Sequence, residues 1–184
     1  MNIDKSNVIK DGRLGNGLAA ASDLEAGEGI IEISNPYMLV VEKASLSKVC
    51  SHCLVEAEKM QRCGRCKVPY YCSTSCQTEA WRSIHRQECK ILQAMPGVPP
   101  TPVRALMQIL LTHSFGTAPD PLWKDLKSNQ REFAQTPRWA DILLQATGAV
   151  QYSKFPSNPA SMELAVGILC RVSQAFSSLA DANL

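Results

Sequence analysis

The chain has 184 residues, of which 45% are hydrophobic and 20% are charged, and its formal net charge is +2. This composition excludes a fibrous repeat and a disordered chain, and the length allows one ordinary domain with a small module inserted in it. The N-terminal residues lack the apolar core of a secretory signal, and no apolar stretch reaches the length of a membrane span. We therefore expect a globular protein of the nucleus or cytoplasm, with no membrane segment and with reduced thiols.

The first segment, residues 1–48, carries short runs that are typical of β-strands. These are GIIEI at residues 29–33 and YMLVV at residues 37–41, separated by Asn and Pro. The dipeptide Asn16-Gly17 is typical of a hairpin turn. We predict a small antiparallel sheet for this segment.

Seven of the eight cysteines follow within one short module, and only Cys170 lies outside it. Together with one histidine they form four pairs: Cys50-x2-Cys53, Cys63-x2-Cys66, Cys72-x3-Cys76 and His85-x3-Cys89. Eight ligands make two tetrahedral sets, one of four cysteines and one of three cysteines and a histidine. Closed sets of this kind are typical of structural zinc.

The spacing of the pairs also predicts their local structure. A C-x2-C knuckle brings two thiolates to one ion, and we expect Gly64 to relieve the backbone in the second knuckle. Ligands four residues apart lie on one face of a helical turn, and Ser73 is a candidate N-cap for a short helix that carries Cys76.

Four alternatives explain the cysteines less well than zinc, and one of them is the purely structural burial of seven cysteines and His85 at these offsets. Disulfides are rare in a reducing compartment, and a redox dithiol would account for only one C-x2-C pair. An iron–sulfur cluster is more usually held by cysteines alone, so His85 argues against it.

The rest of the chain changes from proline-rich to helical. Prolines in residues 91–101 mark a linker, because they break helices. From residue 102 onwards, apolar residues recur three and four apart, which predicts four helices at residues 103–115, 121–133, 138–152 and 161–176.

The order of the pairs, together with YYCSTSCQ, a tryptophan and HRQEC, resembles a MYND-type zinc finger over the whole of residues 49–90. In that family two zinc ions are bound in interleaved fashion. The resemblance implies that Cys50, Cys53, Cys72 and Cys76 share one ion, and that Cys63, Cys66, His85 and Cys89 share the other.

The flanks resemble the SET-and-MYND family of protein-lysine methyltransferases. GRLGNGLAAASDLEAGEGIIEISNPYMLVVE is similar to the opening of their SET domain, and residues 102–184 are similar to their helical insertion. The implied fold is α+β, with a split SET sheet in residues 1–48, the finger in 49–90, the linker in 91–101 and a helical subdomain in 102–184.

The same resemblance implies a site for S-adenosylmethionine. The family's glycine-rich turn matches Gly15, Asn16 and Gly17, and a Ser-Asn pair of the family matches Ser128 and Asn129 in DLKSNQ. Read alone, a G-x-G is more often a plain hairpin turn, and a polar pair on a helix is usually just solvated.

No catalytic residue is assigned, because the family's Asn-His motif, catalytic tyrosine and cysteine cluster follow the helical subdomain. The sequence has no Asn-His pair, and its tyrosines all precede that place. We expect the chain to be truncated before the catalytic core, to bind S-adenosylmethionine only if that half is present, and not to transfer methyl groups efficiently. Its status as an enzyme stays open.

Charge indicates a protein partner. Lys and Arg outnumber Glu eight to four in residues 48–90, but seven thiolates and two Zn²⁺ ions together add three negative charges. The formal charge of the finger falls to about +1, so direct DNA binding is disfavoured.

The resemblance implies histone or other protein lysine substrates for the family. It also implies a protein or peptide partner at Tyr70, Gln77 and Trp81, although Trp81 could equally pack under the zinc sites. The alternative function is a non-catalytic adaptor that recruits protein partners, with transcriptional regulation as a candidate setting.

Overall fold

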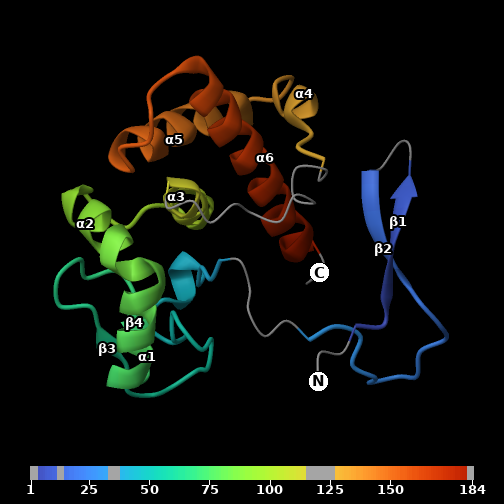
Figure 1. The fold of residues 1–184 in the computed structure, drawn as a ribbon, viewed down its shortest axis with the longest axis horizontal. Helices are drawn as coiled ribbons and strands as arrows, with labels where there is room; N and C mark the ends of the chain where they lie inside the picture. The colour runs from blue at the N-terminus through green and yellow to red at the C-terminus, as the bar shows by residue number, and fades with distance from the viewer. Residues whose placement is uncertain (1–3, 12–14, 33–37, 115–126, 182–184) are drawn as a thin grey trace. The chain divides into compact units, whose positions relative to one another are not determined.

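The computed structural model describes residues 4–11, 15–32, 38–114 and 127–181 (Figure 1). The backbone divides into two compact units. One comprises Met1–Tyr37 and Pro119–Lys127, and the other comprises Met38–Ala118 and Ser128–Leu184. Among the described residues, no helix is both long enough and apolar enough to cross a membrane.

The first unit contains an antiparallel hairpin of strands β1 (Ser6–Asp11) and β2 (Gly15–Ala20). The predicted turn at Asn16-Gly17 is wrong, because both residues lie inside β2, opposite Lys10 and Ile9. The observed register pairs the β-branched Val8 and Ile9 with β2. A turn at Asn16-Gly17 would instead have extended the first strand to include Gly12 and Arg13. These residue types form strands less readily than valine and isoleucine do.

The two predicted strands GIIEI and YMLVV are also wrong where the structure describes them. Ile31 makes one isolated bridge to Asp4, and residues 38–42 form no strand; Ile33 and Tyr37 lie outside the described residues. The carbonyl of Val41 instead accepts a hydrogen bond from the side chain of Arg104. A side chain therefore satisfies a backbone group that a neighbouring strand would have paired.

The second unit begins with the short helix η1 (Lys43–Ser45) and continues into the cysteine module. There, β3 (Gln61–Arg62) pairs antiparallel with β4 (Tyr70–Tyr71). Three helical segments follow without a break: α1 (Thr74–Ala80), the π-helical η2 (Trp81–His85) and α2 (Arg86–Ala94). Single π-helical turns inside α-helices are rare and occur mostly at functional sites.

Each C-x2-C knuckle ends in a residue with left-handed backbone conformation. Leu54 follows Cys53 with φ 60°, and Lys67 follows Cys66 with φ 55°. Such values are uncommon for residues other than glycine. Gly64 has no positive φ, and a Cβ there would meet nothing within 4 Å. The expectation that Gly64 relieves the knuckle is therefore wrong, and the unusual conformation falls on the residue after each second cysteine.

The described part of the chain after residue 100 contains four further helices: α3 (Thr101–Ser114), α4 (Gln130–Phe133), α5 (Arg138–Tyr152) and α6 (Pro159–Asp181). Three of the predicted helices are confirmed. The helix predicted at residues 121–133 is wrong over 127–129, where α4 has not yet begun, and residues 121–126 lie outside the described part. Thr101 and Pro102 open α3, as expected for a proline in the first helical turn.

The core of the second unit lies where α3, α5 and α6 pack on one another (Figure 1). Helix α3 is buried on all sides from Val103 to Leu111, which is typical of a central helix. The largest fully buried apolar side chains are Tyr71 in the finger, Leu106, Met107 and Leu110 on α3, Val150 on α5, and Ile168 and Leu169 on α6. Helix α2 leads from the cysteine module to this core and contacts α3. The segment between α2 and α3 spans only residues 95–100. The domain boundaries at residues 90 and 101 stay predictions.

Candidate metal centre

The first cluster consists of Cys50, Cys53, Cys72 and Cys76, whose sulfur atoms all lie within 4.8 Å of one another. The sulfurs of Cys53 and Cys72 are 3.6 Å apart, and those of Cys72 and Cys76 are 3.5 Å apart. Four sulfurs at about 2.3 Å from one zinc ion lie roughly 3.8 Å from each other. The cluster therefore has the dimensions of a tetrahedral zinc site.

The first cluster is assembled by one knuckle and one helix start. Cys72 directly follows β4, and Cys76 lies in the first turn of α1. The Ser73 hydroxyl accepts a hydrogen bond from the backbone N–H of Cys76 at 3.2 Å, which confirms the predicted N-cap. The cap satisfies a backbone donor that the helix leaves unpaired, and it thereby fixes the position of Cys76.

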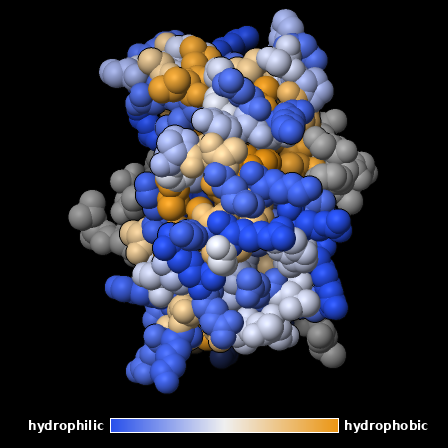
Figure 2. Space-filling view, turned by 90° about the vertical axis from the view of Figure 1, so that its left-hand side faces the viewer, coloured by the Kyte–Doolittle hydropathy of each residue, from blue (hydrophilic) through white to orange (hydrophobic). Residues whose placement is uncertain are grey.

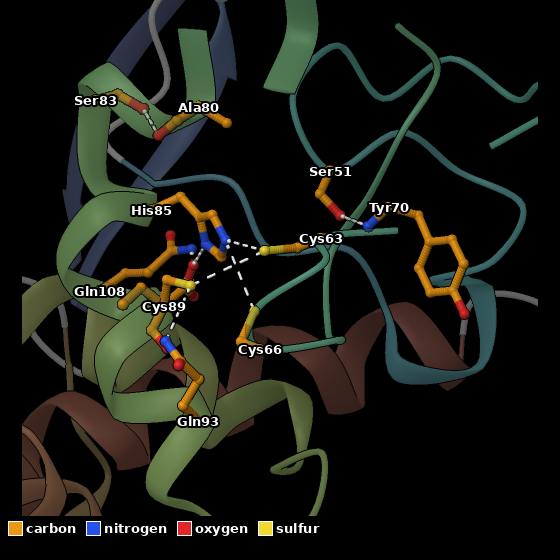
Figure 3. Close-up of polar contacts among 11 residues, drawn as sticks. Ser51, Cys63, Cys66, Tyr70, Ala80, Ser83, His85, Cys89, Gln93 and Gln108 are labelled. Carbon is orange, nitrogen blue, oxygen red and sulfur yellow. Dashed lines mark hydrogen bonds and ion pairs between the residues drawn. The ribbon is translucent and has the colours of Figure 1, made fainter. Parts of the chain in front are cut away.

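The second cluster consists of Cys63, Cys66, His85 and Cys89, and all four side chains are buried. The His85 Nε2 atom lies 3.3 Å from the Cys63 sulfur and 3.7 Å from the Cys66 sulfur, and the Cys63 and Cys89 sulfurs are 3.9 Å apart. Figure 3 shows these side chains converging from the knuckle and from the two helical segments. A nitrogen and a sulfur bound to one zinc lie roughly 3.5 Å apart, so this cluster also fits the ion.

One thiol in each cluster ionises readily. Burial acts to raise the pKa of Cys63, but hydrogen bonds from His85 and from the backbone of Cys66 outweigh it and hold the pKa at about 6. Burial also acts to raise the pKa of Cys50, but hydrogen bonds from backbone N–H groups outweigh it and lower the pKa to about 6. Each cluster can therefore offer one thiolate near neutral pH.

Three further thiols, those of Cys66, Cys89 and Cys72, resist ionisation without a cation. Burial raises the pKa of Cys66 and of Cys89, and the negative charge of Cys63 adds to the rise. The neighbouring sulfurs of Cys76 and Cys53 raise the pKa of Cys72. A divalent ion at the centre of each cluster would remove this repulsion, because a coordinated thiol is deprotonated. All eight cysteines carry free thiols, so no disulfide competes for the ligands.

The imidazole of His85 is fixed on both sides. Its Nδ1 atom lies 3.0 Å from the carboxylate of Glu88, and the rings of Tyr71 and Trp81 contact it edge-on with centroids 6.0 and 5.9 Å away. Since a carboxylate accepts, Nδ1 donates to Glu88, and Nε2 is the nitrogen that gives up its proton and offers its lone pair when a metal ion binds. Burial acts to lower the pKa of His85, but its bonds to Glu88 and Cys63 outweigh this and raise it.

Two outer partners of the second cluster were missed by sequence reasoning, Glu88 and Gln108. Glu88 lies three residues after His85, a spacing that puts both on one helix face and that could have identified it. Gln108 donates from α3 to the other oxygen of Glu88 at 3.1 Å. Gln108 lies 20 residues after Glu88 along the chain, and no local sequence pattern indicates a contact between residues that far apart.

The candidate partner surface is polar and aromatic. Arg62 lies over the ring of Tyr70 at 5.5 Å, and Arg65 lies over Trp81 at 5.6 Å. Trp81 is only half-buried, so it packs on His85 with one part while another part stays exposed. Figure 2 shows hydrophilic residues over much of one face, with hydrophobic residues chiefly in its upper half.

The predicted cofactor residues are distributed over both units. Gly15, Asn16 and Gly17 lie in β2 of the first unit and form part of a strand rather than a turn. Asn129 precedes α4 in the second unit, with a left-handed backbone (φ 49°). Their common role in cofactor binding stays a prediction.

Comparison with known proteins agrees with the metal geometry. The family model of the MYND finger matches residues 50–89. Human histone-lysine N-methyltransferase SMYD3 is 42% identical over 97 residues, which is 52% of this chain and 22% of that protein. SET domain and MYND-type zinc finger protein 6 of Schizosaccharomyces pombe is 32% identical over 172 residues, which is 90% of this chain and 35% of the relative.

The fold and the two clusters thus define a two-zinc finger of the MYND class, attached to a helical region. The chain is a homologue of proteins that are named as SET and MYND domain-containing proteins or as SMYD methyltransferases, and it carries a MYND finger. It spans between about a fifth and about a third of the length of these two relatives.

Proposed function

We propose that this chain serves protein-lysine methylation as the finger-bearing part of a SET-and-MYND-type methyltransferase. The observation that carries the proposal is the pair of interleaved clusters in residues 50–89, in a chain whose relatives include histone-lysine N-methyltransferases. The substrate class is a protein lysine, such as one of a histone tail, and the site of action is the nucleus or the cytoplasm.

The zinc ions have a structural role. One ion is held by the first cluster and the other by the second cluster, so each has four protein ligands and no open position for water or substrate. Catalytic zinc keeps such a position, whereas closed sites contribute to folding. The finger then presents a fixed surface to a protein partner.

S-adenosylmethionine would supply the methyl group, and Gly15, Asn16, Gly17 and Asn129 are the proposed contacts. A Cβ added to Gly17 would lie 3.4 Å from the Ile9 side chain, an ordinary contact. Gly17→Ala is therefore compatible with the hairpin, while its methyl group would stand in the way of a ligand that approaches the backbone.

Calorimetry with S-adenosylmethionine tests this assignment. We expect weak binding at most to the wild-type chain, because the proposed contacts are only part of the family's cofactor site, and weaker binding still to Gly17→Ala. Equal binding by both proteins would remove Gly17 from the site.

A second candidate function is a non-catalytic adaptor, and the stacked pairs Arg62–Tyr70 and Arg65–Trp81 favour it. Aromatic and arginine side chains are enriched where proteins bind one another. Peptides selected from a displayed library should then lose binding to Arg65→Ala while the variant retains both metals.

The coding sequence of the gene discriminates between the two functions. The methyltransferase proposal requires an Asn-His motif, a catalytic tyrosine and a cysteine cluster after the helical region. A coding sequence without them would leave the adaptor as the better account.

A further inference from the structure

The second cluster is connected to the helical core through a buried polar bridge. Glu88 is 7% exposed and receives hydrogen bonds from two directions, from Nδ1 of His85 and from Nε2 of Gln108. Gln108 is 8% exposed and lies on α3, beyond the residues that match the finger. Figure 3 shows Gln108 beside His85, on the side away from Cys63.

We propose that Gln108 is a positioning residue for zinc in the second cluster, acting through Glu88 on the ring of His85. The bridge makes the zinc affinity of the finger depend on the packing of α3. The proposal rests on zinc ligation by the second cluster, and the wild-type metal spectra described below test that ligation separately.

Burial gives the bridge its importance. A buried carboxylate oxygen without a partner costs free energy, and a histidine ligand whose second nitrogen is poorly held binds metal less tightly. Helix α3 supplies both the hydrogen bond from Gln108 and the positive charge of the buried Arg104, which interacts with Glu88. The same helix therefore stabilises Glu88 in two ways.

Helix α2 adds a contact of a different kind. Gln93 donates to the carbonyl of Cys89 at 3.0 Å and lies 3.5 Å from its sulfur. Gln93 and its partner Cys89 both belong to α2, so their hydrogen bond does not depend on the packing of α3. Gln108 is the informative position, because its contact joins two separate helices.

The test replaces zinc with ¹¹³Cd and follows its NMR signals during titration with a chelator. A site of four sulfurs and a site of three sulfurs and one nitrogen give separate resonances, so each cluster is read individually. Two signals in the wild-type protein establish ligation by both clusters, and a missing second signal would refute ligation rather than the bridge.

The decisive variant is Gln108→Met, which keeps the length of the side chain and removes the donor. Loss of an outer partner of a histidine ligand typically weakens metal binding by about tenfold to a hundredfold. We expect the second cluster to release ¹¹³Cd at an about tenfold lower chelator concentration, with the first cluster unchanged. Equal weakening of both clusters, or none of either, would overturn the proposal.

Two controls separate positioning from general stability. Leu106→Val shortens a fully buried side chain of α3 by one methylene group without touching the bridge, so it should leave the second signal as in the wild type. In a Glu88→Ala background, Gln108→Met should have no further effect, because the path through Glu88 is already broken. A Leu106→Val variant that reproduces the loss would contradict the bridge. Should Gln108→Met fail to fold, Gln108→Asn carries the same expectation, since its shorter amide cannot reach Glu88.

Discussion

At the scale of single residues, metal ligands and their supporting partners have distinct roles. The ligands are recognisable from sequence because cysteine and histidine pairs at fixed spacing have few other uses. The supporting partners are polar residues of ordinary types. Ser73 was predictable because an N-cap has a local pattern, whereas Gln108 acts across two helices and has none.

Replacement of Cys63 by Ala should unfold the finger. Zinc binding and folding are coupled in small fingers, and loss of one of four ligands removes much of that free energy. Metal analysis of the purified variant should give fewer zinc ions than the wild type, and circular dichroism should show lost structure. Cys170→Ala is the control, because Cys170 is buried on α6 outside both clusters. Loss of zinc from the control would contradict the ligand assignment.

Replacement of Ser73 by Ala should reduce the stability of the finger by about 1 kcal/mol, the usual cost of losing an N-cap. The first cluster should be affected more than the second, since the cap holds Cys76. Urea denaturation in excess zinc measures the change. Ser75→Ala, on the exposed side of α1, is the matched control and should change stability by less than about 0.5 kcal/mol.

At the scale of elements, sequence periodicity predicted the long helices and failed for the short segments. Helices α3, α5 and α6 all bury apolar residues that recur three and four positions apart over several turns, which gives a clear signal. The run YMLVV has strand-like composition, yet Arg104 takes the carbonyl of Val41. The sequence predicted an antiparallel hairpin but placed its turn wrongly at Asn16-Gly17. This dipeptide is also compatible with a strand, in which Gly17 pairs with Ile9.

The π-helical segment η2 is another element that sequence reasoning did not anticipate. Trp81 contacts His85 within it, and the segment joins α1, which carries a ligand of the first cluster, to α2, which carries a ligand of the second. The spacing His85-x3-Cys89 predicted a shared helix face, but it contains no information about the turn before it.

The buried face of α6 should account for much of the stability of the helical core. Leu169 is fully buried, so Leu169→Ala should lower the free energy of unfolding by about 2–5 kcal/mol. Leu144 on α5 is 73% exposed, and Leu144→Ala should change the free energy of unfolding by less than about 0.5 kcal/mol. Similar losses for both variants would contradict the packing of the helices.

The two clusters should differ in the ease of metal release. Cys53 is exposed and Cys72 and Cys76 are half-buried, whereas every ligand of the second cluster is buried. A chelator reaches exposed thiolates first, so limited chelator should remove ¹¹³Cd from the first cluster before the second. Earlier loss from the second cluster would show that burial does not control release.

At the scale of the whole molecule, metal changes the charge that a partner meets. The chain has a formal charge of +2 and a sequence pI of about 8.1, and two ions bound by seven thiolates shift that charge to −1. Binding driven by phosphate groups depends on the number of cationic contacts, and a net negative charge opposes it. This charge is our reason for proposing a protein partner rather than DNA.

We expect the chain to fold around two zinc ions, and its metal content is the measurement that decides this. Elemental analysis of the purified protein, with protein concentration from amino-acid analysis, should give two zinc ions per chain. A value near one, or iron in place of zinc, would contradict the assignment of eight ligands to two clusters.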